Sequence, residues 1–381
     1  MKKRVGIITL HLGYGGVELS SINLANMLVD DYDVTIINLY KSEIAFEIDK
    51  RVKICALSNV FPNKEEIKDA LKRKRIIRLV KEVIKGAIIL FLRTNLVKKH
   101  LLENEYDYII STLYIYTKLV NKMELNAIKI AIEHKHHSND KKYIRQLISA
   151  CSNIDYLIPV SDELAKFYSN LVKAQCFYIP NCIEYYPNEI NFEKDKLLIA
   201  VGRLVVEKGF NDLIDVFNIV NKKHPDWNLV LVGDGNEREK LEDKIKKLNL
   251  QNHITLTGFL KKDQLNELYK KSSLYLMTSF EEAFGIVVVE AQSFGIPCIA
   301  FSTAKGVLEL IDEQCGVIIE GRNISGMANA VIDLIENEDK RIELSIESYH
   351  SAKKYEFNEV KKKWLKTLKE MKKKSKRMAL R

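Results

Sequence analysis

The sequence predicts an α/β protein built from two Rossmann-like, doubly wound domains that face each other across a cleft. First, its 381 residues exceed the roughly 100–200 residues of one typical domain. Second, short runs of apolar, β-branched residues alternate with longer segments of helical period, which is typical of parallel sheets covered by helices. Third, this alternation is interrupted over residues 181–196 and then restarts.

The first half of the chain opens with the apolar run Val5–Leu10, a glycine-rich loop and a helical segment over Val17–Val29. A basic end before an apolar run also occurs in secretory signals, but no small-residue cleavage site follows, so we expect a first β-strand. Further strands are expected at Asp33–Tyr40, Tyr106–Ser111, Ala127–Glu133, Asp155–Val160 and Cys176–Ile179. These runs are continuously apolar, as expected for strands buried on both faces.

The second half repeats the pattern after residues 181–196, which combine proline, asparagine and charged residues and are interpreted as a linker. Strands are expected at Leu197–Gly202, Asn228–Val232, His253–Thr257, Leu274–Met277, Pro297–Phe301 and Gly316–Ile319. Helices are expected at Gly209–Lys222, Glu237–Leu248 and Ile286–Phe294, with a closing helix near Phe357–Lys374.

The predicted organisation is a first domain over residues 1–180, a linker over 181–196, a second domain over 197–356, and a closing helix with a basic tail over 357–381. The tail is expected to be disordered from Lys372 onward. In sheets of this kind ligands bind at the carboxyl ends of the strands. With two such domains, the cleft between those edges is the natural binding site.

The net charge of +9 is unevenly distributed along the chain. Residues 68–99 hold eleven basic and two acidic residues, and residues 353–381 hold thirteen basic and three acidic ones, so the rest of the chain is net acidic. No recognition motif for nucleic acid accompanies this charge, and we do not expect nucleic-acid binding. The six cysteines are scattered without CxxC spacing, which favours a reducing cytosol over a disulfide framework or a zinc site.

The first basic segment also has amphipathic character, because apolar residues recur at helical spacing from Ile76 to Ile88. A basic amphipathic helix suits an anionic membrane face, although an ordinary solvated helix face would carry similar charges. The longest apolar run elsewhere is far shorter than the ~20 residues of a spanning helix. We therefore expect a cytoplasmic protein, peripheral at the inner face of the cell membrane. The candidate membrane patch consists of Lys72, Arg73, Lys74, Arg75, Arg78, Lys81 and Lys85.

Four segments could carry chemistry, and the first is the loop Gly13-Tyr14-Gly15-Gly16 between the first strand and the first helix. Glycines let the backbone approach a ligand, and the amides of a helix start can meet an anion. The spacing is not that of the dinucleotide fingerprint GxGxxG. A plain tight turn would explain this loop equally well.

The second motif places Arg203 and Lys208 just after the first strand of the second domain. Arginine offers a fork for phosphate oxygens and lysine a point charge, so the two can converge on a diphosphate at the cleft. The alternative is a pair of surface charges on a loop.

The third motif runs from Ser279 to Ala291 and places two carboxylates around a helix start. Glu282 would lie in the loop before the helix, and Glu290 more than one turn inside it. The amides around Phe284–Ile286 suit a phosphate or sugar hydroxyls, while the carboxylates can accept hydrogen bonds from two parts of one long polar ligand. A favourable helix dipole alone would explain Glu282 but not Glu290.

These motifs occur in an order, spread over most of the chain, that resembles glycosyltransferase family 4 (glycosyl transferases group 1). The other matching motifs are Gly15-Gly16-Val17-Glu18, Ile179-Pro180-Asn181, Val232-Gly233-Asp234-Gly235 and Thr257-Gly258-Phe259. The resemblance implies the GT-B fold and a retaining, metal-independent glycosyltransferase without a cofactor. Cys182 departs from the family, which usually has glycine after Pro-Asn.

The resemblance also implies a role for each motif. Arg203 and Lys208 would hold the donor diphosphate, Glu290 would bind the ribose hydroxyls, and Glu282 would bind the hydroxyls of the donor sugar. The backbone of the donor site would come from Gly15 and Gly16 near the phosphates, and from Gly258, Phe259, Leu260, Phe284, Gly285 and Ile286.

The segment Glu133-His134-Lys135-His136-His137 ends a strand of the first domain. Three histidines suggest a metal site, but a strand end does not naturally converge them, so we predict none. The family commonly places a histidine at this strand end, near the donor sugar and the acceptor. We assign this role to His134, with His136 as the alternative, and predict His134, Glu282, Arg203 and Lys208 as the catalytic residues.

The predicted reaction transfers a hexosyl group, with retention, from a UDP-hexose or UDP-N-acetylhexosamine to a hydroxyl of a growing glycan. The basic patch favours a lipid-linked acceptor of a capsule or lipopolysaccharide pathway. Two alternatives remain: a GT-B enzyme of other chemistry, such as a nucleotide-sugar epimerase, or an inactive sugar-nucleotide-binding protein at the membrane. The presence of all four charged motif residues argues against loss of activity.

Overall fold

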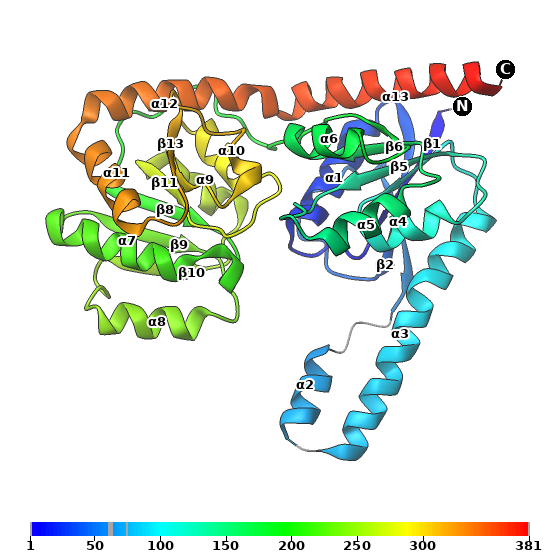
Figure 1. Cartoon of the computed structure of the whole chain (residues 1–381), viewed down its shortest axis with the longest axis horizontal. Coiled ribbons are helices and arrows are strands. Elements are labelled where there is room, and N and C mark those ends of the chain that lie inside the picture. The colour runs from blue at the N-terminus through cyan, green and yellow to red at the C-terminus, as the bar shows by residue number, and fades with distance from the viewer. Residues whose placement is uncertain (1, 60–63, 74, 380–381) are drawn as a thin grey trace.

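The computed structural model describes residues 2–59, 64–73 and 75–379. It confirms two Rossmann-like domains, each with a parallel sheet between layers of helices (Figure 1). The described strands of the first sheet are ordered β3-β2-β1-β4-β5-β6-β7, and those of the second β10-β9-β8-β11-β12-β13. The order reverses between β1 and β4 in the first sheet and between β8 and β11 in the second, and such reversals mark the ligand crevice of doubly wound sheets.

The strands of the first sheet are β1 (Lys3–Thr9), β2 (Tyr32–Tyr40), β3 (Lys53–Ser58), β4 (Tyr108–Ser111), β5 (Ile128–Glu133), β6 (Tyr156–Pro159) and β7 (Gln175–Cys176). Those of the second sheet are β8 (Leu197–Val201), β9 (Asn228–Val232), β10 (Ile254–Gly258), β11 (Leu274–Met277), β12 (Cys298–Phe301) and β13 (Gly316–Ile319). The central strands β4 and β11 are buried over their whole length, as their continuous apolar sequences predict.

Helices cover both sheets. In the first domain they are α1 (Gly16–Leu28), α2 (Lys64–Lys72), α3 (Ile76–Glu103), α4 (Tyr114–Asn121), α5 (Lys141–Ala150) and α6 (Asp162–Ser169). In the second domain they are α7 (Phe210–Lys223), α8 (Arg238–Lys247), α9 (Lys262–Lys271), α10 (Ile286–Ser293), α11 (Ile324–Glu336) and α12 (Glu338–Ala352), with the short 3-10 helices η1 (Val206–Lys208), η2 (Lys305–Val307) and η3 (Lys353–Tyr355).

The last helix, α13 (Phe357–Ala379), starts at the second domain and runs back along the first (Figure 1). Leu368 and Met371 are fully buried, and their carbonyls accept hydrogen bonds from the hydroxyls of Tyr108 and Tyr156 on the first sheet. A disordered tail is expected from Lys372 onward, but this expectation is wrong for residues 372–379, which continue the helix α13. Buried packing anchors the helix, and good helix formers continue it.

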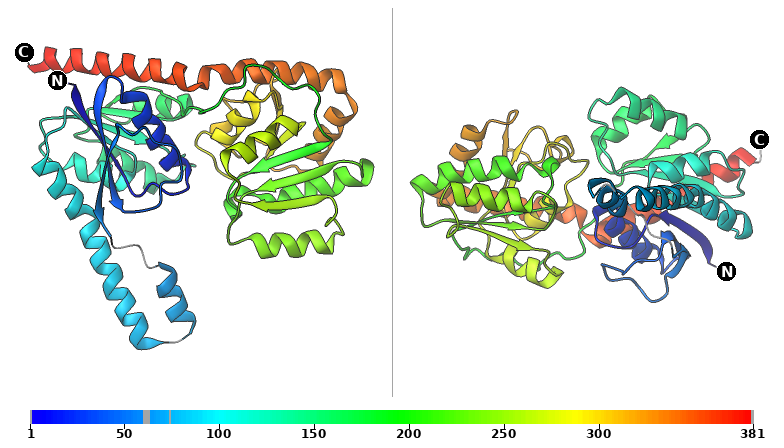
Figure 2. Two further views of the ribbon diagram at one scale, coloured as in Figure 1. Left: turned by 180° about the vertical axis from the view of Figure 1, so that it is seen from behind. Right: turned by 90° about the horizontal axis from the view of Figure 1, so that it is seen from below.

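Helices α2 and α3 form a hairpin that projects from the body of the first domain (Figures 1 and 2). Near its end α3 is anchored by the buried side chains of Val97 and Leu101, whereas Ile77 and Phe91 are 88% and 69% exposed. The predicted helix at residues 76–88 is confirmed and is the outer part of a 28-residue helix. Lys74 of the candidate patch lies outside the described residues.

One strand, β3, was missing from the sequence prediction. Its sequence Lys-Ile-Cys-Ala-Leu-Ser has no continuous apolar run, because β3 is an edge strand whose residues are all at least partly exposed. None of the described helices combines the length and hydropathy that a membrane span requires.

Candidate functional site

The predicted site residues gather where the strand order reverses in the two sheets. The glycine loop follows β1, the Arg203–Lys208 loop follows β8, and the Glu282 loop follows β11. In both domains these are the carboxyl ends of central strands, so the loops border the crevice that this topology provides.

Lys208 and Glu282 come from different loops and form an ion pair. The Lys208 ammonium donates to Glu282 Oε1, and the Ser279 hydroxyl donates to the same oxygen over 3.0 Å. The two charged side chains are only 22% and 14% exposed. The sequence predicted a role for each residue separately, and the structure brings them into direct contact.

A glycine makes this contact possible. Gly209 has a φ of 66°, and a Cβ at this position would lie 2.1 Å from the backbone oxygen of Thr278. The Thr278 hydroxyl in turn donates to the carbonyl of Lys208 over 3.1 Å. Because only glycine combines a left-handed conformation with so close an approach, the Lys-Gly sequence sets Lys208 against the end of β11.

The start of α10 presents free amides beside this ion pair. Gly285 caps the helix with a φ of 83°. Within the described residues, the backbone N–H groups of Phe284, Gly285 and Ile286 have no hydrogen-bond acceptor. The Phe284 side chain is itself buried, with its ring 5.5 Å from that of Tyr355, so Phe284 offers the site only its backbone. Helix-start amides of this kind bind anions and hydroxyl oxygens.

Glu290 lies inside α10 and is 7% exposed. The Lys262 ammonium donates to its Oε1 over 2.5 Å, and the Tyr269 hydroxyl lies 3.4 Å from its Oε2. A buried carboxylate requires such partners, and here they come from α9.

The glycine loop faces the loop after β10. The rings of Tyr14 and Phe259 stack with their centroids 5.7 Å apart, although both side chains are more than half exposed. The predicted base-binding segment at Gly258, Phe259 and Leu260 therefore touches the first domain directly. Gly258 has a φ of 72°, which turns the chain at the end of β10.

Arg203 is exposed and lies near the glycine loop of the opposite domain. Burial raises the pKa of Glu18 at the start of α1, and the nearby charges of His11 and Arg203 partly oppose this rise. A Cβ at Gly15 would meet Glu18 Oε2 at 2.0 Å, whereas a Cβ at Gly16 would meet nothing within 4 Å. Glycine at position 15 makes room for Glu18, and position 16 borders open space.

His134 follows β5 directly. Its Nε2 is buried and has no hydrogen-bond partner in the described part of the chain. Burial lowers the pKa of this imidazole to about 4, so the ring is neutral near neutral pH. A neutral ring with an unused nitrogen can hydrogen-bond to a ligand hydroxyl.

His136 and His137 come together in space, although histidines at the end of a strand are not expected to do so. The nearest candidate ligand atoms of His136, His137 and Glu163 lie within 4.8 Å of one another. However, the backbone N–H groups of Ser138 and Asn139 donate to Nδ1 of His136 and His137 over 2.9 and 3.0 Å. A metal-bound imidazole donates from its second nitrogen instead. This hydrogen-bond pattern favours a tight turn over a metal site.

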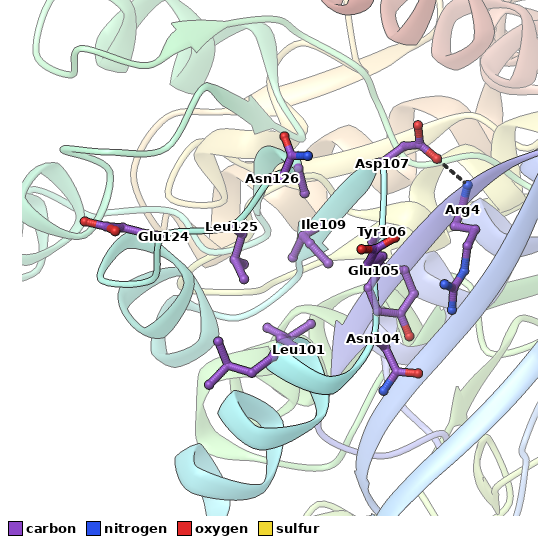
Figure 3. A pocket seen from close by; sticks show the side chains of 12 residues that line it. Arg4, Leu101, Asn104, Glu105, Tyr106, Asp107, Ile109, Glu124, Leu125 and Asn126 are labelled. Atoms are coloured by element: carbon purple, nitrogen blue, oxygen red, sulfur yellow. Dashed lines mark hydrogen bonds between the residues drawn. The ribbon is translucent and has the colours of Figure 1, made fainter.

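A separate hollow lies at the amino ends of β1 and β4, the edge of the sheet opposite the candidate site (Figure 3). It is lined by Arg4, Tyr106, Asp107 and Leu125 among others, and the Arg4 backbone N–H donates to Asp107 over 2.9 Å. None of the predicted site residues lines it.

Sequence reasoning missed Tyr14 and Lys262 as site residues. Nothing in a single Tyr between glycines predicts a partner in the other domain. Lys262 did carry a signal, because it is the first residue of α9, where the helix dipole disfavours a cation. A lysine there indicates a specific acidic partner.

Comparison with known proteins adds the activity class. Residues 183–351 match the family described as glycosyl transferases group 1. The chain is 27% identical to an uncharacterized glycosyltransferase of Haemophilus influenzae, over 95% of this chain and 99% of the relative. These matches support glycosyltransferase activity for the present chain. A second relative of the chain is a Campylobacter jejuni N-acetyl-D-galactosaminyltransferase named for a PP-undecaprenol-linked glycan. It is 25% identical over 97% of the chain and 99% of the relative.

A solved structure supports the two-domain fold of the present chain. A mutant of S. aureus TarM, crystallised with fondaparinux, alpha-GlcNAc-glycerol and UDP, superposes with a TM-score of 0.75 at 17% identity, covering 96% of this chain and 99% of that one. The expected GT-B arrangement of two Rossmann-like domains is therefore confirmed.

Proposed function

We propose that the chain is a retaining family 4 glycosyltransferase that moves a hexosyl residue from a UDP-sugar to a hydroxyl of a growing, lipid-linked cell-surface glycan. The observation that carries the proposal is the Lys208–Glu282 ion pair next to the free amides at the start of α10. A cation and helix-start amides suit a diphosphate, and the adjoining carboxylate suits sugar hydroxyls.

The donor would lie along the second domain. Lys208 and Arg203 would neutralise the charge that builds on the departing diphosphate, which is electrostatic stabilisation of the transition state. Glu282 would accept hydrogen bonds from the donor sugar, and Glu290 from the ribose. Because Glu282 already holds Lys208 in place, the cation is pre-positioned before the diphosphate arrives.

The first domain would supply the acceptor side. His134 is neutral near neutral pH and has an unused buried nitrogen, so it can hydrogen-bond a sugar hydroxyl without adding charge. The contact between Tyr14 and Phe259 supports a closed cleft that excludes water and disfavours hydrolysis of the donor. Front-face attack by the acceptor hydroxyl would retain the anomeric configuration without a covalent nucleophile or a metal.

The comparisons support the choice of donor and acceptor. TarM was crystallised with UDP, and the Campylobacter relative is named for a glycan on PP-undecaprenol. The projecting α2–α3 hairpin, with exposed basic and apolar side chains, supports attachment to an anionic membrane face, which would bring the enzyme to a lipid-linked acceptor.

The donor site is tested by thermal shift with UDP, GDP, ADP and their sugar conjugates, without added metal. We expect the melting temperature to rise with UDP and its sugars, because a ligand that binds only the folded state stabilises it. Lys208→Ala should abolish the shift and reduce transfer by about 100-fold or more. The exposed Lys240→Ala on α8 is the matched control. Wild-type shifts in Lys208→Ala would contradict the site, and an inverted product anomer, seen by NMR, would contradict retention.

A further inference from the structure

We infer that Lys262 is a positioning residue that fixes the Glu290 carboxylate for the ribose hydroxyls of the donor nucleotide. This inference rests on the proposed function, which assigns Glu290 to the ribose. It adds a residue that the motif spacing does not contain, at the start of the helix that follows the base-binding loop.

The geometry of the pair is that of a built site. Lys262 begins α9 only two residues after Leu260, and its ammonium crosses to α10 to donate to Glu290 Oε1 over 2.5 Å. The Lys262 side chain is 34% exposed and that of Glu290 9%. Lys262 is therefore the more exposed member of the pair, and it fixes a carboxylate that is almost wholly enclosed.

The surrounding charges explain why a lysine is needed. Glu184, in the segment that joins the two domains, acts electrostatically on both Lys262 and Glu290, and partial desolvation raises its pKa. Glu290 is buried and Glu184 is exposed, and two neighbouring carboxylates would repel each other without a cation between them. Lys262 supplies that cation, and its pKa is raised because Glu290 and Glu184 outweigh the effect of its own burial.

The arrangement leaves Glu290 able to bind two hydroxyls. An ionised carboxylate has about four acceptor positions. Lys262 uses one position on Oε1, and the Tyr269 hydroxyl, 3.4 Å away, contacts Oε2 only weakly. The remaining positions can accept the 2′- and 3′-hydroxyls of a ribose, provided that the carboxylate keeps this orientation.

The test measures the Kd of UDP and of 2′-deoxy-UDP by calorimetry, for the full chain and for Lys262→Met. A site built to bind a hydroxyl discriminates strongly against a ligand that lacks it. We expect the wild type to prefer UDP over 2′-deoxy-UDP by about 10-fold or more. Lys262→Met should lose most of this preference, because its affinity for UDP falls while its affinity for 2′-deoxy-UDP stays the same. Lys262→Arg, which keeps the charge, should restore much of it.

Two controls separate the possible failures. Lys270→Met removes a lysine of the same helix that pairs with the exposed Glu267, and it should leave both Kd values unchanged. Glu290→Gln should abolish the preference for UDP. If Glu290→Gln does so and Lys262→Met does not, or if Lys262→Met weakens both nucleotides equally, the inference on Lys262 is wrong. If Glu290→Gln changes neither Kd, the proposed ribose site itself is wrong. Should Lys262→Met not fold, as judged by circular dichroism, Lys262→Gln takes its place with the same expected results.

Discussion

Paired charges organise the second-domain side of the site. Glu282 holds Lys208 and Glu290 holds Lys262, and both lysines come from other loops or helices. The seven residues between the two glutamates place one carboxylate before the helix and the other inside it, so that the two ion pairs lie at different positions along α10. A polar ligand at the proposed site would therefore meet charges that are already oriented, which reduces the cost of ordering them on binding.

A second kind of buried charge lies in the first domain, at Glu133. Its carboxylate accepts the Lys135 N–H over 2.7 Å and the Tyr143 O–H over 2.9 Å, and burial raises its pKa to about 7. The unfolded value is ~4.3, so between these values the folded state holds a proton that the unfolded state has lost. Folding stability should therefore fall as the pH rises from about 4.3 to 7.

Glu133→Gln should remove this dependence, because the amide does not titrate. Between about pH 5 and about pH 8, the unfolding free energy of the wild type should fall by about 2–3 kcal/mol relative to that of the variant. Urea denaturation at several pH values measures the difference. Parallel pH profiles for the two proteins would assign the proton to another group.

At the scale of elements, continuous apolar runs predicted the central strands because those strands are buried on both faces. The edge strand β3 lacks such a run, and the sequence gives no sign that it pairs with β2. The segment from Ser279 to Ala291 predicted the loop after β11 and the helix α10 that follows it, since both are local in the chain. Contacts between distant segments, such as Tyr14 with Phe259, depend on how the two domains face each other, which no local pattern contains.

The turn between η1 and α7 is an element on which the site depends. Gly209→Ala should destabilise the fold by more than the roughly 1–3 kcal/mol of a left-handed non-glycine residue, because its Cβ would also clash with Thr278. Gly321 is a matched control, since its φ is 62° but its Cβ would meet nothing within 4 Å. Chemical denaturation of the two variants gives the comparison, and equal losses would show that the close contact is unimportant.

At the scale of the whole molecule, α13 joins the second domain to the first, while the α2–α3 hairpin extends away from both (Figure 2). Along the outer part of α3 the exposed apolar side chains lie on one stripe, which consists of Ile76, Ile77, Val80, Val83, Ile84, Ile88 and Phe91. At 100° per residue, Arg78, Lys81 and Lys85 fall together beside this stripe. An apolar stripe with a basic border matches the interface of an anionic bilayer.

Charge reversal on this border tests the attachment. The triple variant Arg78→Glu, Lys81→Glu and Lys85→Glu should bind phosphatidylglycerol vesicles about 100-fold more weakly or worse, since each basic residue near such a surface contributes ~1 kcal/mol. The control variant Lys246→Glu, Lys247→Glu and Lys271→Glu changes the net charge equally on exposed positions of the second domain. Co-sedimentation that falls equally for both variants would indicate an effect of net charge alone. If only the hairpin variant dissociates and still transfers sugar to a soluble acceptor analogue, the hairpin serves attachment and the cleft serves chemistry.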